Sequence, residues 1–172
     1  MRTDLATINF ALYEDAIEYG GLVQVTLPNL SAITQAISGA GIAGNIEAII
    51  IGHIDAMSTT LNWRTHKGHT IRLSEPRLHY IDLRAPVQDE DNVNGTLVTR
   101  NVKHVMTVIP KTETGGTIAP ASPVNGSTEF AVRYWATYID GVLYREIDPT
   151  NMIYYVDGVD YLAAARKAMG KQ

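Results

Sequence analysis

Cysteine is absent from this chain of 172 residues, which excludes a disulfide framework and a thiolate metal site. Charge is scarce: 14 Lys and Arg against 18 Asp and Glu give a net charge of −4. This balance argues against adhesion to nucleic acid, which needs clustered Lys and Arg. The longest apolar-rich run, Ile46 to Ile51, is far too short to span a bilayer and contains Glu47. No basic region followed by an apolar core opens the chain, so we expect no membrane segment, no secretory signal and a soluble protein made in the cytosol.

Catalytic motifs are lacking as well: there is no G-x-S-x-G, H-E-x-x-H, Walker loop or Cys-His arrangement. The G-x-G-x-x-G at Gly39–Gly44 is not followed by a helical pattern, because three consecutive isoleucines favour a strand over Asn45–Ile51. We interpret it as a glycine-rich connector. His66 and His69 form an H-x-x-H, but Gly68 lies between them and no carboxylate is at ligand spacing. We therefore predict no enzyme activity, no cofactor and no metal site.

Alternating apolar and polar residues dominate what remains. Val23, Val25 and Leu27 alternate with polar residues, and Met57, Leu61 and Trp63 would share one face of another strand. The segment 31–38 fits a helix or a strand, and its glycine-rich surroundings favour a strand. The pattern predicts eight or nine strands, with candidate segments at 8–13, 22–27, 31–38, 45–51, 57–63, 78–83, 96–109, 128–139, 142–147 and 152–156.

Two polar connections interrupt this pattern. Residues 85–95 contain the acidic run Asp89-Glu90-Asp91, which has no EF-hand spacing and reads as a solvated loop tip. Residues 111–127 are rich in Gly, Pro, Thr and Ser and predict a mobile loop. In the strand after it, the spacing predicts Phe130, Val132, Tyr134 and Tyr138 on one face.

The end of the chain has the strongest turn signals. Asp140-Gly141 and Asp157-Gly158 are typical of two-residue hairpin turns. A short helix is expected near 160–169, with Arg166-Lys167 in its last turn and Gly170 as its stop. Together these patterns predict a single, mainly β domain over 1–172: an antiparallel β-sandwich or barrel with one or two short helices.

Two blocks of sequence contain specific short motifs. The first, from about Phe10 to Trp63, contains NFALYED, VTLPNL, GAGIAG and LNW. The second, from Tyr134 to Gly170, contains DG, EIDPTNMI and DGVD before the closing helix. The two blocks resemble the major tail tube proteins of contractile-tailed, P2-like bacteriophages. The chain departs from the family where a longer amphipathic helix usually follows Trp63, because Pro76 interrupts that place.

The resemblance implies a tail-tube fold and a virion protein of the tail tube, assembled in the host bacterial cytoplasm. It implies homo-hexameric rings that stack into a hollow tube inside a contractile sheath, with hairpins of neighbours joined edge to edge. Sheath, tape measure, baseplate and tail-terminator proteins would be its partners, and genome DNA would pass without specific binding. A contractile bacteriocin or related particle would use the same subunit.

Two further expectations concern sites. We expect Gly39, Gly41, Gly44 and Asn45, together with Gly115 and Gly116, to contact neighbouring subunits. The alternative function is a monomeric β-sandwich module that binds a ligand with Tyr134, Trp135 and Tyr138, since such aromatics can stack on a sugar or base.

Overall fold

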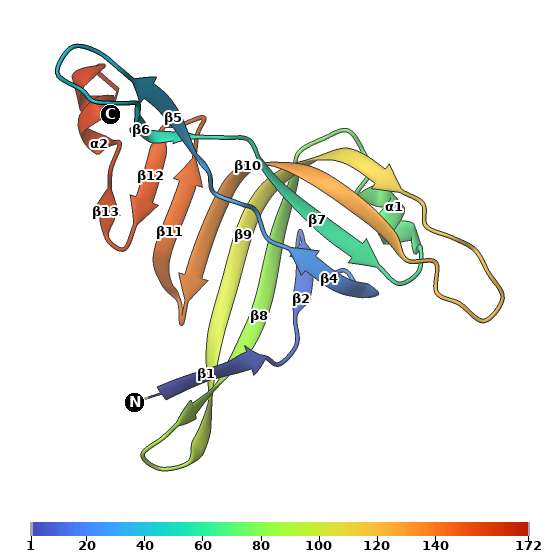
Figure 1. Cartoon of the computed structure of the whole chain (residues 1–172). Helices are drawn as coiled ribbons and strands as arrows, with labels where there is room; N and C mark the ends of the chain where they lie inside the picture. Colours follow the sequence, from blue (N-terminus) through green and yellow to red (C-terminus); the bar gives the residue numbers. More distant parts are fainter. Residues whose placement is uncertain (1, 172) are drawn as a thin grey trace.

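The computed structural model describes residues 2–171 and is a mainly antiparallel β structure (Figure 1). Its elements are β1 Arg2–Thr7, β2 Ala11–Glu14, β3 Ile17–Glu18, β4 Leu22–Thr26, β5 Ala32–Ile37, β6 Ile46–Ile54, β7 Met57–Trp63, α1 Gly68–Arg72, β8 His79–Asp91, β9 Thr96–Thr114, β10 Gly126–Ile139, β11 Val142–Asp148, β12 Ile153–Val156, β13 Val159–Asp160 and α2 Ala163–Ala168. The predicted fold class is confirmed. No helix within residues 2–171 is both long and apolar enough to cross a membrane.

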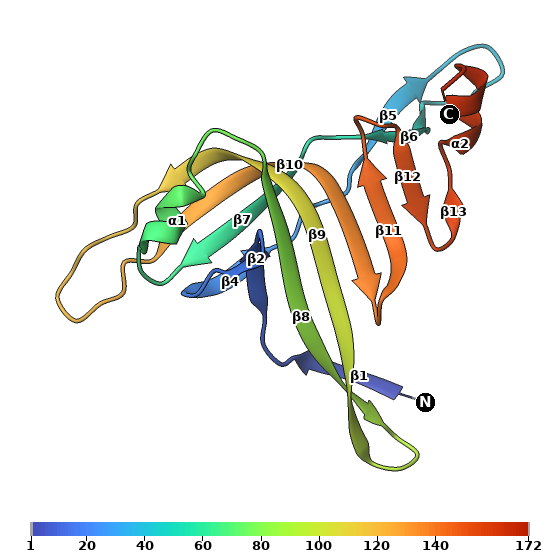
Figure 2. The same ribbon diagram turned by 180° about the vertical axis from the view of Figure 1, so that it is seen from behind.

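The long strands β8, β9 and β10 form the centre of an 11-stranded sheet. On one side β10 pairs with β9. On its other side it pairs first with β7, through Gly126–Val132, and then with β11, through Trp135–Ile139. The partner changes where the register with β9 shifts, between Val132 and Tyr134. Figures 1 and 2 show that the sheet is strongly curved, with β4 and β7 on one wing and β11 to β13 on the other.

The core lies on one face of this curved sheet. Along β7 the side chains of Met57, Leu61 and Trp63 are all buried, which confirms the predicted alternation. Phe130 of β10 and Met106 of β9 are buried with them. Truncating a large buried aromatic residue to Ala costs about 3–5 kcal/mol, so Trp63 and Phe130 are major contributors to stability.

The β10 prediction is wrong at its second half. Phe130 and Val132 face the core, but the register shift after Val132 moves the inward position to Trp135. Tyr134 and Tyr138 therefore lie on the opposite face from Phe130. A β-bulge of this kind adds one residue to a strand and inverts the alternation beyond it.

The predicted connector at 85–95 is also wrong. β8 continues to Asp91, and the turn itself is confined to residues 92–95. Two interactions explain the extension: β1 pairs with Val87–Asp91, and Arg100 binds the buried carboxylate of Asp89 at 3.2 Å. The predicted first strand at 8–13 is shorter in the structure: β2 begins at Ala11 and is preceded by β1.

The other connections follow the turn chemistry. Asp140 and Gly141 have φ of 49° and 81°, and Asp157 and Gly158 have φ of 46° and 87°, as two-residue hairpin turns require. β9 runs to Thr114, so the long connection to β10 is residues 115–125. After Trp63 the chain forms α1, a helix of five residues.

Candidate assembly surfaces

A hairpin of β5 and β6 stands apart from the rest of the sheet. We call residues 32–54 the isoleucine arm: its two strands pair with each other and form a separate sheet. Ile49 is 68% exposed, and six more isoleucines of the arm are exposed: Ile33, Ile37, Ile42, Ile46, Ile50 and Ile51. Figures 1 and 2 show the arm at one end of the molecule, beside α2. Contiguous apolar patches of this kind on soluble proteins mark interaction sites.

The arm is held to the body at its base. The Asp55 N–H donates to the Ser31 carbonyl at 2.8 Å and closes the hairpin. Gly52 has φ of +71°, and a Cβ atom there would lie 2.5 Å from the side chain of Leu162. Only glycine fits both this conformation and this close approach. Gly52 and Leu162 therefore form a clasp between β6 and the segment that leads into α2.

The predicted interface residues Gly39, Gly41, Gly44 and Asn45 occupy the exposed tip of the arm. Gly41 and Gly44 have φ of 93° and 126°. The G-x-G-x-x-G motif thus joins two antiparallel strands and precedes no helix, so it is not a dinucleotide fingerprint. Whether this tip contacts a neighbour stays a prediction.

Gly115 and Gly116 lie elsewhere, at the base of the 115–125 loop. The Gly115 carbonyl lies 2.8 Å from Nε2 of His66. A Cβ atom on Gly116 would lie 2.1 Å from the Val124 carbonyl oxygen, so this glycine is needed to close the loop. Figures 1 and 2 place this loop and the arm on opposite sides of the molecule. The structure therefore divides the six predicted residues between two surfaces.

β9 has an open edge along its first six residues, Thr96–Asn101. β8 pairs with it on one side, whereas β10 reaches only as far as Val102. The main chain of Asn101 faces this edge, because its N–H donates to the Asp140 carboxylate at 2.9 Å and its carbonyl accepts from the Asp140 N–H at 2.8 Å.

The direction in which the main-chain N–H and C=O groups of Asn101 point determines which of the preceding residues point the same way. The residue opposite Asn101 in β8 is Pro86, which has no N–H to offer. Main-chain groups alternate in direction along an antiparallel strand. Those of Leu97 and Thr99 therefore face the open edge too, and no hydrogen bond to them from that side occurs within residues 2–171.

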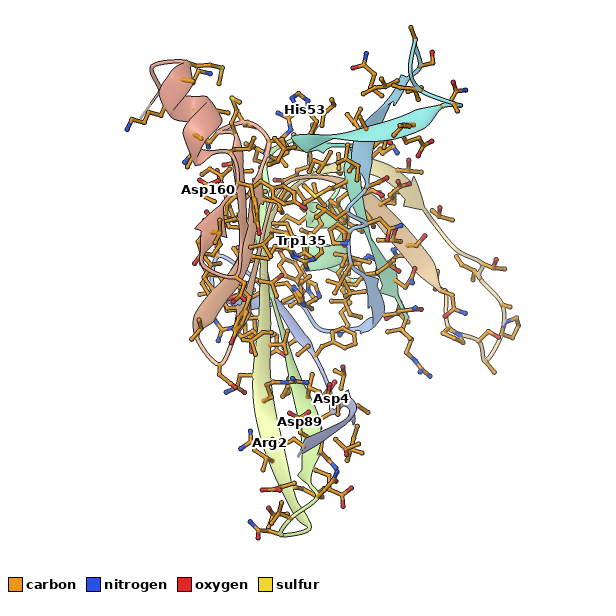
Figure 3. The ribbon with its side chains drawn as sticks, turned by 60° about the vertical axis from the view of Figure 1, so that its left-hand side comes forward. Arg2, Asp4, His53, Asp89, Trp135 and Asp160 are labelled. Atoms are coloured by element: carbon orange, nitrogen blue, oxygen red, sulfur yellow. The ribbon has the colours of Figure 1, made fainter. Side chains whose placement is uncertain are left out.

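The three aromatic residues of the alternative function do not form one surface. Trp135 is buried in the interior, as Figure 3 shows, with the Arg145 guanidinium 3.7 Å from its ring centroid. The Tyr134 hydroxyl donates to Glu146 at 2.9 Å on the other face of the sheet. Since successive side chains of a strand point to opposite faces, Trp135 lies on the other face from Tyr134 and Tyr138, and the predicted stacking site is wrong.

The histidine pair is also separated by its partners. Nε2 of His66 lies against the Gly115 carbonyl, whereas Nε2 of His69 lies 3.1 Å from the Gly20 carbonyl. Within residues 2–171, no group of three His, Asp or Glu side chains could hold a metal ion. Both side chains serve to tie the α1 segment to neighbouring loops.

One buried polar network was not anticipated. The Glu14 carboxylate accepts hydrogen bonds from the Tyr19 hydroxyl and from Nδ1 of His79, at 2.5 Å for His79, and Arg77 lies 3.2 Å away. Nε2 of His79 donates to the Glu75 carbonyl at 3.0 Å. Burial alone would raise the pKa of Glu14, but the bonds from Tyr19 and His79 and the charges of His79 and Arg77 hold that pKa below its usual value. Glu14 and His79 are 65 residues apart, and no sequence pattern connects them.

We compared the chain with protein families, curated protein sequences and solved structures. The family model described as phage tail tube protein FII matches residues 6–170. Comparison with curated protein sequences gives no match. Among solved structures, the sheath/tube terminator of the extracellular contractile injection system PVC, in its extended state, is similar with a TM-score of 0.54. That likeness has 10% identity and covers 78% of this chain and 96% of the other. At this identity it shows a shared fold.

Two further structures are similar at lower scores. The PVC sheath-tube complex has a TM-score of 0.45, 13% identity and coverage of 77% and 88%. The baseplate of the anti-feeding prophage has a TM-score of 0.42, 10% identity and coverage of 77% and 91%. The family match spans nearly the whole chain, and the antiparallel fold is the one that the resemblance implied. The chain belongs to the phage tail tube protein FII family and is a structural tail tube protein.

Proposed function

We propose that this protein forms homo-hexameric rings that stack into a hollow conduit inside a contractile sheath. The observation that carries the proposal is the presence, on one chain, of an unpaired apolar hairpin and an open strand edge. The isoleucine arm offers strands with a free edge, and Thr96–Asn101 of β9 offers the backbone groups that a further strand would bind.

The two surfaces match in length and chemistry. β5 has six residues, equal to the six of the open β9 edge. β5 also carries no charge, so it can be covered without desolvating an ion. An arm strand added to β9 of a neighbour would satisfy Leu97 and Thr99 and cover the exposed isoleucines. Cyclic closure then leaves no free edge, which removes the aggregation hazard of a monomer.

The net charge of the chain supports the proposed role as a conduit. A net charge of −4 gives the subunit no surplus of cations with which to hold a polyanion. DNA, or the effector of a related particle, would then pass without specific binding. Sheath, tape measure, baseplate and tail-terminator proteins would be the companions of the tube in a virion assembled in the host cytoplasm.

A proline at position 99 tests the edge pairing. Proline is tolerated at an edge where the lost N–H faces solvent, so Thr99→Pro should fold normally. It removes the donor that the arm of a neighbour needs. We expect Thr99→Pro to remain monomeric by analytical ultracentrifugation with an unchanged circular dichroism spectrum, whereas Thr99→Val, which keeps the N–H, forms rings. Rings of normal stability from Thr99→Pro would overturn the pairing.

A further inference from the structure

The α1 segment is a basic surface on an acidic protein. Residues 64–77 carry four of the 14 Lys and Arg residues and only one of the 18 acids, Glu75. We call the exposed side chains of Arg64, Lys67, Ile71 and Arg72 the α1 knob. Ile71 is 59% exposed. The ion pairs found within residues 2–171 include no partner for these three cations.

The turn between β8 and β9 has the complementary chemistry. We call Glu90, Asp91, Val93 and Leu97 the hairpin tip. Val93 is 77% exposed and Leu97 64%. The acidic side chains around these apolar residues outnumber the basic ones. Arg100 alone pairs with two of the acids, Asp4 and Asp89. Arg2 lies opposite Asp91 in the β1–β8 pairing, and Arg2 and Arg100 are the only Lys or Arg residues in β1 and in residues 87–100.

These two surfaces lie at opposite ends of the β8–β9 hairpin, with the α1 knob just before β8. α1 ends at Arg72 shortly before β8 begins, and the hairpin tip follows the other end of β8. The 13 residues of β8 correspond to about 43 Å measured along the strand. Figures 1 and 2 show α1 and the β8–β9 turn at opposite ends of the long strands. The knob and the tip of one chain therefore do not meet.

We propose that the hairpin tip of one copy docks on the α1 knob of a second copy, and that this contact stacks successive rings. The inference rests on the proposed function and names the surfaces that join ring to ring. Val93 and Leu97 cover Ile71, while Glu90 and Asp91 lie among the three cations. Because the two surfaces differ and lie at opposite ends, the contact is head to tail and repeats without limit.

The mixed chemistry of the knob favours this occupant over nucleic acid. A phosphate backbone would bind the cations but leave Ile71 uncovered, and the knob has no aromatic side chain on which a base could stack. The hairpin tip supplies both carboxylates and apolar surface.

A charge exchange between the surfaces tests the contact. The knob variant is Lys67→Glu with Arg72→Glu, and the tip variant is Glu90→Lys with Val93→Lys. Each variant should form rings but need at least about tenfold more protein to form tubes, because like charges then face each other. Combining all four changes should restore stacking. Arg133→Glu, an exposed change outside both surfaces, should stack as the wild type does.

Tube length by electron microscopy and ring mass by ultracentrifugation separate the outcomes. Wild-type tubes should also shorten to rings near 1 M salt, where the screening length is about 3 Å. Normal stacking by either variant, or no recovery in the combination, would overturn the contact. A knob variant that stacks normally but loses binding to a sheath protein or to DNA would overturn it and identify the other occupant. Wild-type protein that forms no rings would instead remove the proposed function, and this contact with it.

Discussion

The indole Nε1 of Trp135 donates a hydrogen bond to Nδ1 of His104 across 3.3 Å in the interior of the sheet. The Thr137 hydroxyl lies 3.1 Å from the same nitrogen, and Arg145 donates to that hydroxyl at 3.2 Å. Nδ1 must therefore accept, which makes His104 neutral with its proton on Nε2. Burial, with the Arg145 charge beside it, lowers the pKa of His104 to about 4.

This arrangement predicts a loss of stability in mild acid. The folded pKa of His104 lies below the unfolded value of 6.5, so the full contribution is present above pH 6.5 and is lost as pH falls toward 4. The full loss, reached near pH 4, is about 3 kcal/mol, and about 2 kcal/mol of it falls between pH 7 and pH 5. Urea denaturation of the monomeric Thr99→Pro protein at pH 7 and pH 5 measures this second part.

The control for this prediction removes the titrating group. His104→Gln should flatten the dependence between pH 7 and 5, whereas His53→Asn, a change at an exposed histidine of the arm, should leave it unchanged. An equal slope in His104→Gln and wild type would contradict the assignment.

The Glu14 network predicts a large effect from a nearly isosteric change. Glu14→Gln removes the anion that pairs with His79 and Arg77 in the interior, and losing one partner of a buried pair costs about 3–5 kcal/mol. The lowered pKa of Glu14 also means that its contribution is present above its unfolded pKa and is lost as pH falls through the folded value. Glu47→Gln, at an exposed acid for which the ion pairs found within residues 2–171 include no partner, should leave the urea midpoint unchanged. Similar midpoints for the two variants would show that the network is not stabilising.

The clasp at the base of the arm predicts a local effect. Gly52→Ala places a methyl group against Leu162 and adds about 1–2 kcal/mol of left-handed strain. Amide hydrogen exchange in residues 32–54 should accelerate, while β8 to β10 keep their protection. Gly52→Ala with Leu162→Ala should recover part of the protection, because the clash is relieved and the strain remains. Unchanged exchange in the single variant would contradict the clasp.

Local signals predicted local structure well. The alternation of Met57, Leu61 and Trp63 identified the buried face of β7, and both Asp-Gly pairs form the turns their chemistry requires. The glycine-rich stretch at Gly39–Gly44 was correctly interpreted as a connector between strands. In each case the residues that decide the conformation are neighbours in the chain.

Features that depend on distant partners were not predicted. The bulge after Val132 arises where β10 changes partner from β7 to β11, so Trp135 looked like a surface aromatic. Asp89 looked like a loop residue because its partners are not its neighbours in the chain. Arg100 binds its carboxylate from β9, and β1, which pairs with this part of β8, has no strand pattern in the sequence. The isolation of the isoleucine arm is likewise a property of the sheet as a whole.

The central claim is that the chain closes into six-membered rings through its arm and the open β9 edge. Sedimentation velocity of the purified wild-type protein, with electron microscopy of the same sample, tests it most directly. We expect a species of six chains that appears as a ring with an open centre and extends into hollow tubes at higher concentration. A species with the mass of one chain at every concentration, and no rings in the images, would contradict it.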